Sequence, residues 1–249
     1  MKFLYYIYQI LVSPVLLVVT ILTSLVTTVG CAVGNAARWS YYPGKWWSII
    51  IIRLLLLPVR VEGRENMDER QSYIIIPNHQ GTFDIFLIYG FLKRHFKWML
   101  KEELRTMPLV GSACESAGFI FVDPHAGPKK MKETHDRASQ ILQGGTSLVV
   151  FPEGARTWDG RLRSFKRGGF QLADELQLPL LPVTINGSFQ VLPRKRGYVN
   201  FIQWHPLTLT IHPPILMKGH GSEAEHEAMQ EAYRRIESRL EPVPNSLKS

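Results

Sequence analysis

Two short stretches of this 249-residue sequence carry side chains with chemical potential. In the first, residues 73–86 (YIIIPNHQGTFDIF), His79 and Asp84 are five positions apart. A β-rich run precedes them, Pro77 ends it, and Thr82 is a residue type that often caps the start of a helix. This order predicts that His79 lies in the loop after a strand and Asp84 in the first turn of a helix.

The spacing lets the Asp84 carboxylate reach one nitrogen of the His79 imidazole across that bend. The carboxylate would then fix the tautomer of the ring and leave the other nitrogen free to act as a base. Ligands of open α/β sheets bind at this edge, beyond the carboxyl ends of the strands. A surface histidine near an aspartate that favours a helix N-terminus gives the same pattern without chemistry.

The second stretch, residues 147–170 (SLVVFPEGARTWDGRLRSFKRGGF), again has a strand that ends in a proline. Glu153 and Gly154 come directly after it. Five cations then gather within twelve residues: Arg156, Arg161, Arg163, Lys166 and Arg167. Glycine permits close approach of the backbone, and arginines hold anionic groups, so the stretch predicts an anion site. A solvated basic loop has the same composition.

The remaining pattern supplies the elements that must position these two stretches. Short apolar β-rich runs alternate with longer mixed runs of helical character along the chain. The β-rich runs cover residues 73–76, 119–122, 147–151, 180–185 and 207–212, and the helical ones cover 83–95, 128–142, 166–177 and 222–240. This alternation predicts an α/β fold with a central, largely parallel (mixed) sheet flanked by helices.

The N-terminal part of the chain has the character of a membrane anchor. Residues 3–34 contain no charged side chain. As a helix, residues 3–29 would reach about 40 Å at about 1.5 Å per residue, against a hydrocarbon core of about 30 Å. A second apolar segment at 46–59 contains Arg53 and follows several aromatic residues, which favours an interfacial helix. The run is too long for an ordinary cleaved signal peptide.

These features predict an anchor over residues 1–60 and a folded domain over residues 61–249. The basic residues that follow the first apolar segment outnumber the one before it, which favours the cytoplasmic side of the cell membrane for the folded domain. Whether the first segment crosses the bilayer or dips into one leaflet stays open.

The amino-acid composition limits the classes of protein and of binding partner that need to be considered. Lys and Arg total 29 against 21 for Asp and Glu, a net charge of +8, which favours an anionic partner such as phosphate or a lipid surface. Two cysteines exclude a disulfide-rich scaffold and a zinc finger. A mean hydropathy of −0.03 excludes a polytopic transporter. We expect no nucleic-acid partner, since no binding motif is present, and the oligomeric state stays open.

The two stretches together resemble the glycerolipid acyltransferase family, most closely the 1-acyl-sn-glycerol-3-phosphate acyltransferases. Residues 78–84 fit the pattern NHxxxxD and residues 151–156 read FPEGAR. The similarity extends, in the family's order, to residues 101–111, 118–123, 165–168 and 181–185. It therefore covers roughly residues 72–190.

The resemblance implies that an acyl chain passes from acyl-CoA or an acyl carrier protein to the hydroxyl of lysophosphatidic acid, forming phosphatidic acid without a metal or cofactor. His79 would be the general base and Asp84 would orient it. The resemblance further implies that Glu153, Gly154 and Arg156 belong to the acceptor site, with Lys101 and Arg167 as additional phosphate contacts.

One departure leaves the acceptor open. Family members usually carry an arginine soon after the pair that is Phe121-Val122 here, but Asp123 follows in this sequence. A lyso-ornithine lipid or another lysophospholipid therefore remains an alternative acceptor. Two other functions also remain: a metal-dependent phosphohydrolase, although no second close-spaced His/Asp set accompanies the first, and a non-enzymatic membrane scaffold, which leaves both motifs unexplained.

Overall fold

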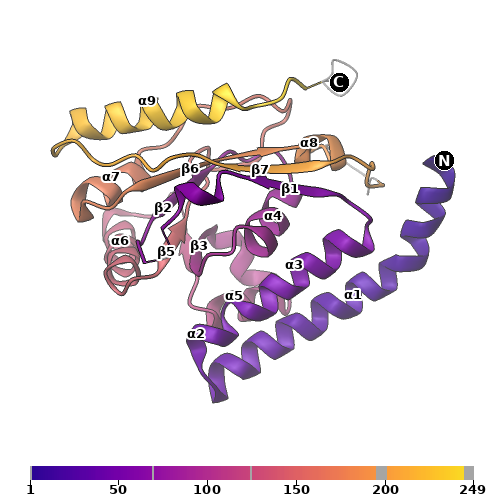
Figure 1. Cartoon of the computed structure of the whole chain (residues 1–249). Helices are drawn as coiled ribbons and strands as arrows, with labels where there is room; N and C mark the ends of the chain where they lie inside the picture. The colour runs from indigo at the N-terminus through magenta and orange to yellow at the C-terminus, as the bar shows by residue number, and fades with distance from the viewer. Residues whose placement is uncertain (1, 69, 124, 195–200, 244–249) are drawn as a thin grey trace.

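The computed structural model describes residues 2–68, 70–123, 125–194 and 201–243. Seven strands within these ranges form one sheet in the order β1-β7-β6-β2-β5-β3-β4 (Figure 1). Their bounds are Val59–Glu62 (β1), Ile74–Pro77 (β2), Phe96–Lys101 (β3), Ile120–Val122 (β4), Ser147–Val149 (β5), Leu180–Asn186 (β6) and Leu207–Ile211 (β7). The β6–β7 pair is antiparallel and the other neighbouring pairs are parallel. The prediction of a largely parallel α/β sheet is confirmed.

Helices cover both faces of this sheet. They are α1 (Lys2–Val33), α2 (Ala36–Trp39), α3 (Tyr42–Leu54), α4 (Phe83–Phe91), α5 (Val110–Ser116), α6 (Pro128–Gln143), α7 (Gly168–Leu176), α8 (Ser188–Val191) and α9 (Ser222–Ser238). Two short 3₁₀ turns span Arg64–Asn66 and Glu102–Thr106. Helices α3 and α4 pack on one face, and α6, α7 and α9 pack on the other (Figure 1).

The sequence of β2 explains why it lies at the centre of these layers. Successive side chains of a strand point to opposite faces. Ile75 packs in the core beneath α3 and α4, whereas Ile74 and Ile76 pack beneath α6, α7 and α9. All three are fully buried. A continuous apolar run is therefore what a strand covered on both faces requires.

The parallel register brings the two chemical stretches to one edge. Strand β2 pairs in parallel with β5 on one side and with β6 on the other. Their carboxyl ends consequently meet where the chain enters the loop at 78–82, the long loop at 150–167 and helix α8. The fold places His79 and Glu153 side by side in space although they are far apart in sequence.

The structure contains two strands that the sequence pattern did not predict, β1 and β3. The helix expected over 83–95 ends at Phe91, and Lys93 adopts a left-handed conformation with φ of 59°. Strand β3 follows, and Lys97 interrupts its apolar alternation. The Nζ of Lys97 donates to Ser40 Oγ at 2.7 Å and to the Ala117 carbonyl at 2.6 Å, which satisfies the charge inside the strand.

The second apolar segment also differs from its expected bounds. Helix α3 begins at Tyr42 and ends at Leu54, not at residue 59, because the chain turns at Leu56, where φ is 54°. Val59 then opens β1, and Ile52 is buried in the core. The boundary expected at residue 60 thus falls inside a strand, and the division into 1–60 and 61–249 stays a prediction.

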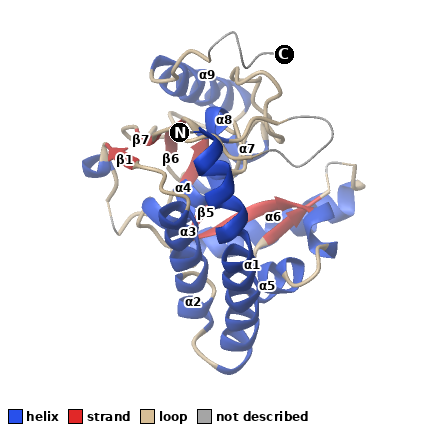
Figure 2. Ribbon diagram, turned by 90° about the vertical axis from the view of Figure 1, so that its right-hand side faces the viewer, coloured by secondary structure: helices blue, strands red, loops and turns tan. Residues whose placement is uncertain are grey.

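Helix α1 lies along the outside of α3, as Figures 1 and 2 both show. Its buried residues are polar or small: Gln9, Ser24, Thr27 and Gly30. Its large apolar side chains are exposed instead, among them Phe3, Leu11, Leu22 and Val29. It is the one helix in the described ranges that is long and apolar enough to cross a membrane. The polar side faces the protein and the apolar side faces outward, which is the pattern of a helix in contact with lipid.

Hydrogen bonds fasten α1 to the rest of the molecule along its length. The hydroxyls of Tyr5 and Tyr8 donate to the last carbonyls of α3. The Trp47 indole donates to Thr20 Oγ1 at 3.0 Å. The Gln9 side chain bonds both main-chain groups of Ile202, at 2.8 and 2.9 Å. Helix α1 is therefore docked on the folded body and is not a detached stalk.

Candidate active site

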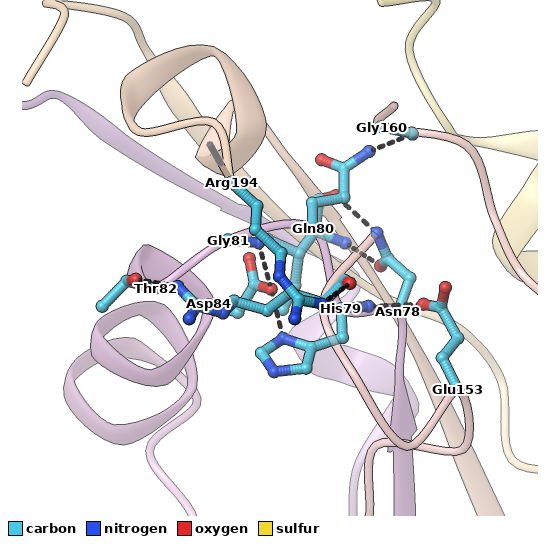
Figure 3. Close-up of polar contacts among 11 residues, drawn as sticks. Asn78, His79, Gln80, Gly81, Thr82, Asp84, Glu153, Gly160 and Arg194 are labelled. Carbon is cyan, nitrogen blue, oxygen red and sulfur yellow. Dashed lines mark hydrogen bonds and ion pairs between the residues drawn. The ribbon is translucent and has the colours of Figure 1, made fainter. Parts of the chain in front are cut away.

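A hydrogen-bonded pair of a histidine and a buried aspartate forms the centre of the site. His79 lies in the loop that leaves β2 and Asp84 in the first turn of α4 (Figure 3). The Nδ1 atom of His79 is 2.8 Å from Oδ2 of Asp84. The same oxygen accepts the main-chain N–H of Gly81 at 2.9 Å, and the Asp84 side chain is fully buried. The carboxylate thus orients the imidazole and leaves Nε2 for another partner.

The second stretch supports the imidazole from the other side. The ring of Phe151 stacks on that of His79, with centroids 3.8 Å apart and planes 16° apart. The Thr157 N–H donates to the His79 carbonyl at 3.0 Å. The His79 side chain keeps 15% of its surface exposed. Packing and hydrogen bonds therefore fix the ring while leaving it access to a substrate.

Asn78 fixes the point where the chain leaves β2. Its Nδ2 donates to the Ile185 carbonyl at 3.0 Å, and its Oδ1 accepts the Ile185 N–H at 2.7 Å. The residue is 1% exposed. The amide thus replaces a rung of the ladder beyond the end of β2 and joins the His79 loop to β6. Sequence reasoning assigned it no role, although an asparagine directly after a buried strand was a usable signal.

Glu153 joins the two loops through the backbone. Its Oε1 accepts the His79 N–H at 2.6 Å and its Oε2 accepts the Arg163 N–H at 2.9 Å. Burial, assisted by the nearby charge of Asp84, raises the pKa of the Glu153 carboxyl to about 7, and the two backbone hydrogen bonds oppose that rise. In this structure Glu153 supports the main chain of the base, and its predicted contact with the acceptor stays a prediction.

Arg156 extends along the start of α4. Its Nη1 donates to Thr82 Oγ1 at 2.7 Å, so the Thr82 hydroxyl serves the arginine and does not cap the helix. Gly154 turns the chain before it with φ of 72°, in the left-handed region that favours glycine. A Cβ at Gly154 would lie 2.8 Å from the Lys166 side chain. This turn directs Arg156 toward the His79 loop.

The structure separates the other two predicted phosphate contacts from this cluster to different degrees. Arg167 forms an ion pair of 2.7 Å with Glu225 of α9 and lines a hollow there with Ser222. Lys101 ends β3 and is exposed, with β5 between its strand and β2. The structure thus brings together His79, Asp84, Glu153 and Arg156, whereas Arg167 lies apart from them. The phosphate contacts predicted for Lys101 and Arg167 stay predictions.

Arg194 is a residue of the site that sequence reasoning missed. It follows α8 and its Nη1 donates to the Arg156 carbonyl at 2.8 Å. Figure 3 shows its side chain reaching down toward the loop that holds His79 and Asp84. The signal was present as a basic run, residues 194–196, shortly after the buried strand β6.

This arrangement has the parts for one kind of chemistry. An oriented imidazole with a free Nε2 can remove a proton from a hydroxyl. Neighbouring guanidinium groups can hold an anionic part of the same substrate. Among the residues that the structure describes, no group of three or more His, Cys, Asp or Glu side chains is arranged to hold a metal ion.

Comparison with known proteins points the same way. The family model described as Acyltransferase matches residues 58–186. The chain is 29% identical to the chloroplastic 1-acyl-sn-glycerol-3-phosphate acyltransferase LPAT1 of Arabidopsis thaliana, over 76% of this chain and 51% of that protein. It is 32% identical to 1-acyl-sn-glycerol-3-phosphate acyltransferase alpha of Mus musculus, over 68% and 61% of the two chains. The chain thus spans about half the length of the first curated relatives it matches.

A solved structure matches over nearly the whole chain. It is the crystal structure of the 1-acyl-sn-glycerophosphate (LPA) acyltransferase PlsC from Thermotoga maritima, with a TM-score of 0.74 and 26% sequence identity. The match covers 95% of each chain.

The buried carboxyl of Glu153 predicts a specific dependence of stability on pH. A carboxyl whose folded-state pKa is raised from 4.5 to about 7 stabilises the fold at low pH and loses that contribution as pH rises through 7. Wild type should therefore lose stability between pH 5 and pH 8 relative to Glu153→Gln, which does not titrate. The change is a few kcal/mol at most, since one pKa unit corresponds to about 1.4 kcal/mol.

Thermal unfolding of both proteins across that pH range measures the difference. Glu153→Gln should also be less stable than wild type at pH 5 by about 1–3 kcal/mol, because its amide N–H faces a backbone N–H. Parallel pH profiles for the two proteins would contradict the raised pKa.

Proposed function

The chain belongs to the Acyltransferase family, and we propose that it transfers an acyl chain from an acyl thioester to the free hydroxyl of lysophosphatidic acid, giving phosphatidic acid in phospholipid biosynthesis. The observation that carries the proposal is the hydrogen bond between His79 and the buried Asp84 beside the guanidinium of Arg156. The names of the relatives and of the matching crystal structure support the same acceptor.

The chemistry follows from the free nitrogen of His79. Its Nε2 accepts the proton of the acceptor hydroxyl while the hydroxyl oxygen attacks the thioester carbonyl. The tetrahedral intermediate then collapses, the C–S bond breaks, and the proton on the imidazolium passes to the leaving thiolate. Asp84 stabilises the imidazolium during the step, because its charge lies 2.8 Å from Nδ1. The products are an ester and a thiol, and no covalent enzyme intermediate is required.

The proposed mechanism works with either of two acyl donors. Acyl-CoA and acyl carrier protein present the same thioester to His79, and the proposal covers both. Other lyso-lipids, such as a lyso-ornithine lipid or a lysophospholipid with a larger headgroup, are the second candidate acceptors. Asp123, which follows β4 where family members usually have an arginine, is the observation that favours keeping them.

An acceptor panel tests the proposed reaction. Purified protein is incubated with one acyl-CoA and, in turn, lysophosphatidic acid, a lyso-ornithine lipid and lysophosphatidylcholine, with and without excess chelator. We expect thiol release and a new diacyl product with lysophosphatidic acid, undiminished by chelator. Phosphate release that chelator abolishes would favour a metal-dependent phosphohydrolase, and no turnover with any acceptor would leave only the membrane scaffold.

Substitution of the base tests the mechanism. His79→Ala should lower kcat for acyl transfer about 10²–10⁴-fold, the usual contribution of a positioned general base, without loss of the fold. His125→Ala is the matched control, since His125 is exposed and lies outside the cluster, and it should leave kcat unchanged. Retention by His79→Ala of more than a tenth of wild-type turnover, measured as thiol release, would refute the assignment.

We propose further that α1 attaches the enzyme to the cell membrane by lying in one leaflet, with the catalytic domain on the cytoplasmic side. Contacts at both ends of the helix support this orientation. Gln9 near its start bonds Ile202, and Gly30 near its end packs against Trp39. Because both ends of the helix contact the same folded body, the helix cannot cross the hydrocarbon core without carrying that body with it. The basic residues after α1 favour the cytoplasmic side.

The outward side of α1 generates a prediction about membrane binding. Leu11 and Leu22 are 71% and 54% exposed, so each offers apolar surface to lipid. Leu11→Lys and Leu22→Lys should weaken flotation with phosphatidylglycerol vesicles, because burial of a leucine contributes about 1.5–3 kcal/mol. Gln171→Lys adds the same charge on the exposed side of α7 and should float like wild type. Equal flotation of all four proteins would contradict a role for α1.

A further inference from the structure

Two arginines from different loops meet at the edge of the sheet. Arg156 comes from the long loop after β5, and Arg194 comes from the segment after α8. The Arg194 Nη1 donates to the Arg156 carbonyl at 2.8 Å, which fixes Arg194 against the Arg156 main chain. Figure 3 shows the Arg194 side chain directed toward the loop that holds His79 and Gly81.

Trp158 sets the orientation of Arg194. The guanidinium carbon lies over the Trp158 ring, 3.8 Å from its centroid, which is a cation–π contact. This contact holds the group in place without using any of its five N–H donors.

Within the described part of the chain, most of the hydrogen-bonding capacity of both arginines is unused. Each guanidinium carries five N–H donors. The described contacts engage one nitrogen of Arg194, with the Arg156 carbonyl, and one of Arg156, with Thr82 Oγ1. Among the residues that the structure describes, neither arginine has a carboxylate within ion-pair distance.

The charges around this pair are of like sign. Burial, together with the fields of Arg156 and of a third cation, Arg163, lowers the pKa of Arg194. Like charges gathered without an anion repel each other, and a bound anion would remove that repulsion. A phosphomonoester fits the donors best, because its three terminal oxygens accept paired N–H groups from arginine forks.

We propose that Arg194 is a substrate-binding residue which, together with Arg156, holds the phosphomonoester of the acceptor. The inference rests on the proposed function, since it names the group that anchors the acceptor while His79 acts on its hydroxyl. The two guanidinium groups are the source of selectivity, because a phosphodiester headgroup offers them fewer terminal oxygens and less negative charge than a phosphomonoester does. Arg194 therefore favours lysophosphatidic acid over acceptors with esterified or uncharged headgroups.

Steady-state kinetics with matched variants test this role. Arg194→Gln should raise KM for lysophosphatidic acid about tenfold or more, as expected for a lost hydrogen bond to a charged group, with kcat changed less than about threefold. Arg194→Lys should restore part of the loss, because it keeps the charge and loses the fork. Arg234→Gln removes an exposed cation of α9, 66% exposed and 2.8 Å from Glu231, and should match wild type.

A second acceptor and a binding measurement separate the possible results. With monoacylglycerol, which lacks the phosphate, Arg194→Gln should match wild type. Titration calorimetry with glycerol 3-phosphate should show binding to wild type and Arg234→Gln and weakened binding to Arg194→Gln. An unchanged KM for lysophosphatidic acid, or an equal rise for monoacylglycerol, would overturn the role of Arg194.

The calorimetry also distinguishes this inference from the proposed function. Wild-type protein that binds glycerol 3-phosphate through Arg194 but does not acylate lysophosphatidic acid would retain the anion site and reject the acceptor. Thermal unfolding of Arg194→Gln should stay within a few degrees of wild type, since the side chain lies in a loop and is not part of the core.

Discussion

The rest of the site depends on one buried carboxylate. Asp84 has no exposed surface, and a charge in such a position is unfavourable unless hydrogen bonds and an opposite charge compensate for it. The His79 ring and the Gly81 N–H both bond the same oxygen, Oδ2. The position of the imidazole is therefore a consequence of satisfying Asp84. Any movement of the loop that separated the two would leave a buried anion without its partner.

The two loops around this pair form one rigid unit. Glu153 accepts the His79 N–H, Phe151 stacks on the ring, and the Thr157 N–H donates to the His79 carbonyl. All three belong to the loop after β5, whereas His79 follows β2. The parallel pairing of β2 with β5 brings the loops together, and backbone hydrogen bonds then align them. Glu153 thus has a structural role in joining the two loops, independent of any contact with a substrate.

Much of this organisation could be predicted from local pattern. The apolar runs at 73–76 and 147–151 predicted strands that each lead into a loop with candidate site residues, and the spacing of His79 and Asp84 predicted their contact. Strand β3 could not be found in this way, because it contains Lys97. The hydrogen-bond acceptors of Lys97 are Ser40 and Ala117, which come from other segments of the chain. The same reason hid Arg194, whose place beside Arg156 depends on a hydrogen bond between two loops. Pattern predicts elements and their order, whereas contacts between loops require the assembled sheet. The arginine expected near Asp123 is absent, and on our proposal Arg194 supplies a cation from a different loop.

The clamp between Gln9 and Ile202 has a mechanical consequence. Gln9 belongs to the lipid-facing helix, and Ile202 is followed by Gln203, whose N–H donates to the carbonyl of Val191 at the end of α8. Arg194 lies three residues after Val191 in the sequence. Hydrogen bonds and short chain segments thus connect α1 to Arg194. On our proposals for α1 and Arg194, a change in lipid packing that tilts α1 would displace the Arg194 segment, and the thickness and fluidity of the leaflet would then affect binding of the acceptor.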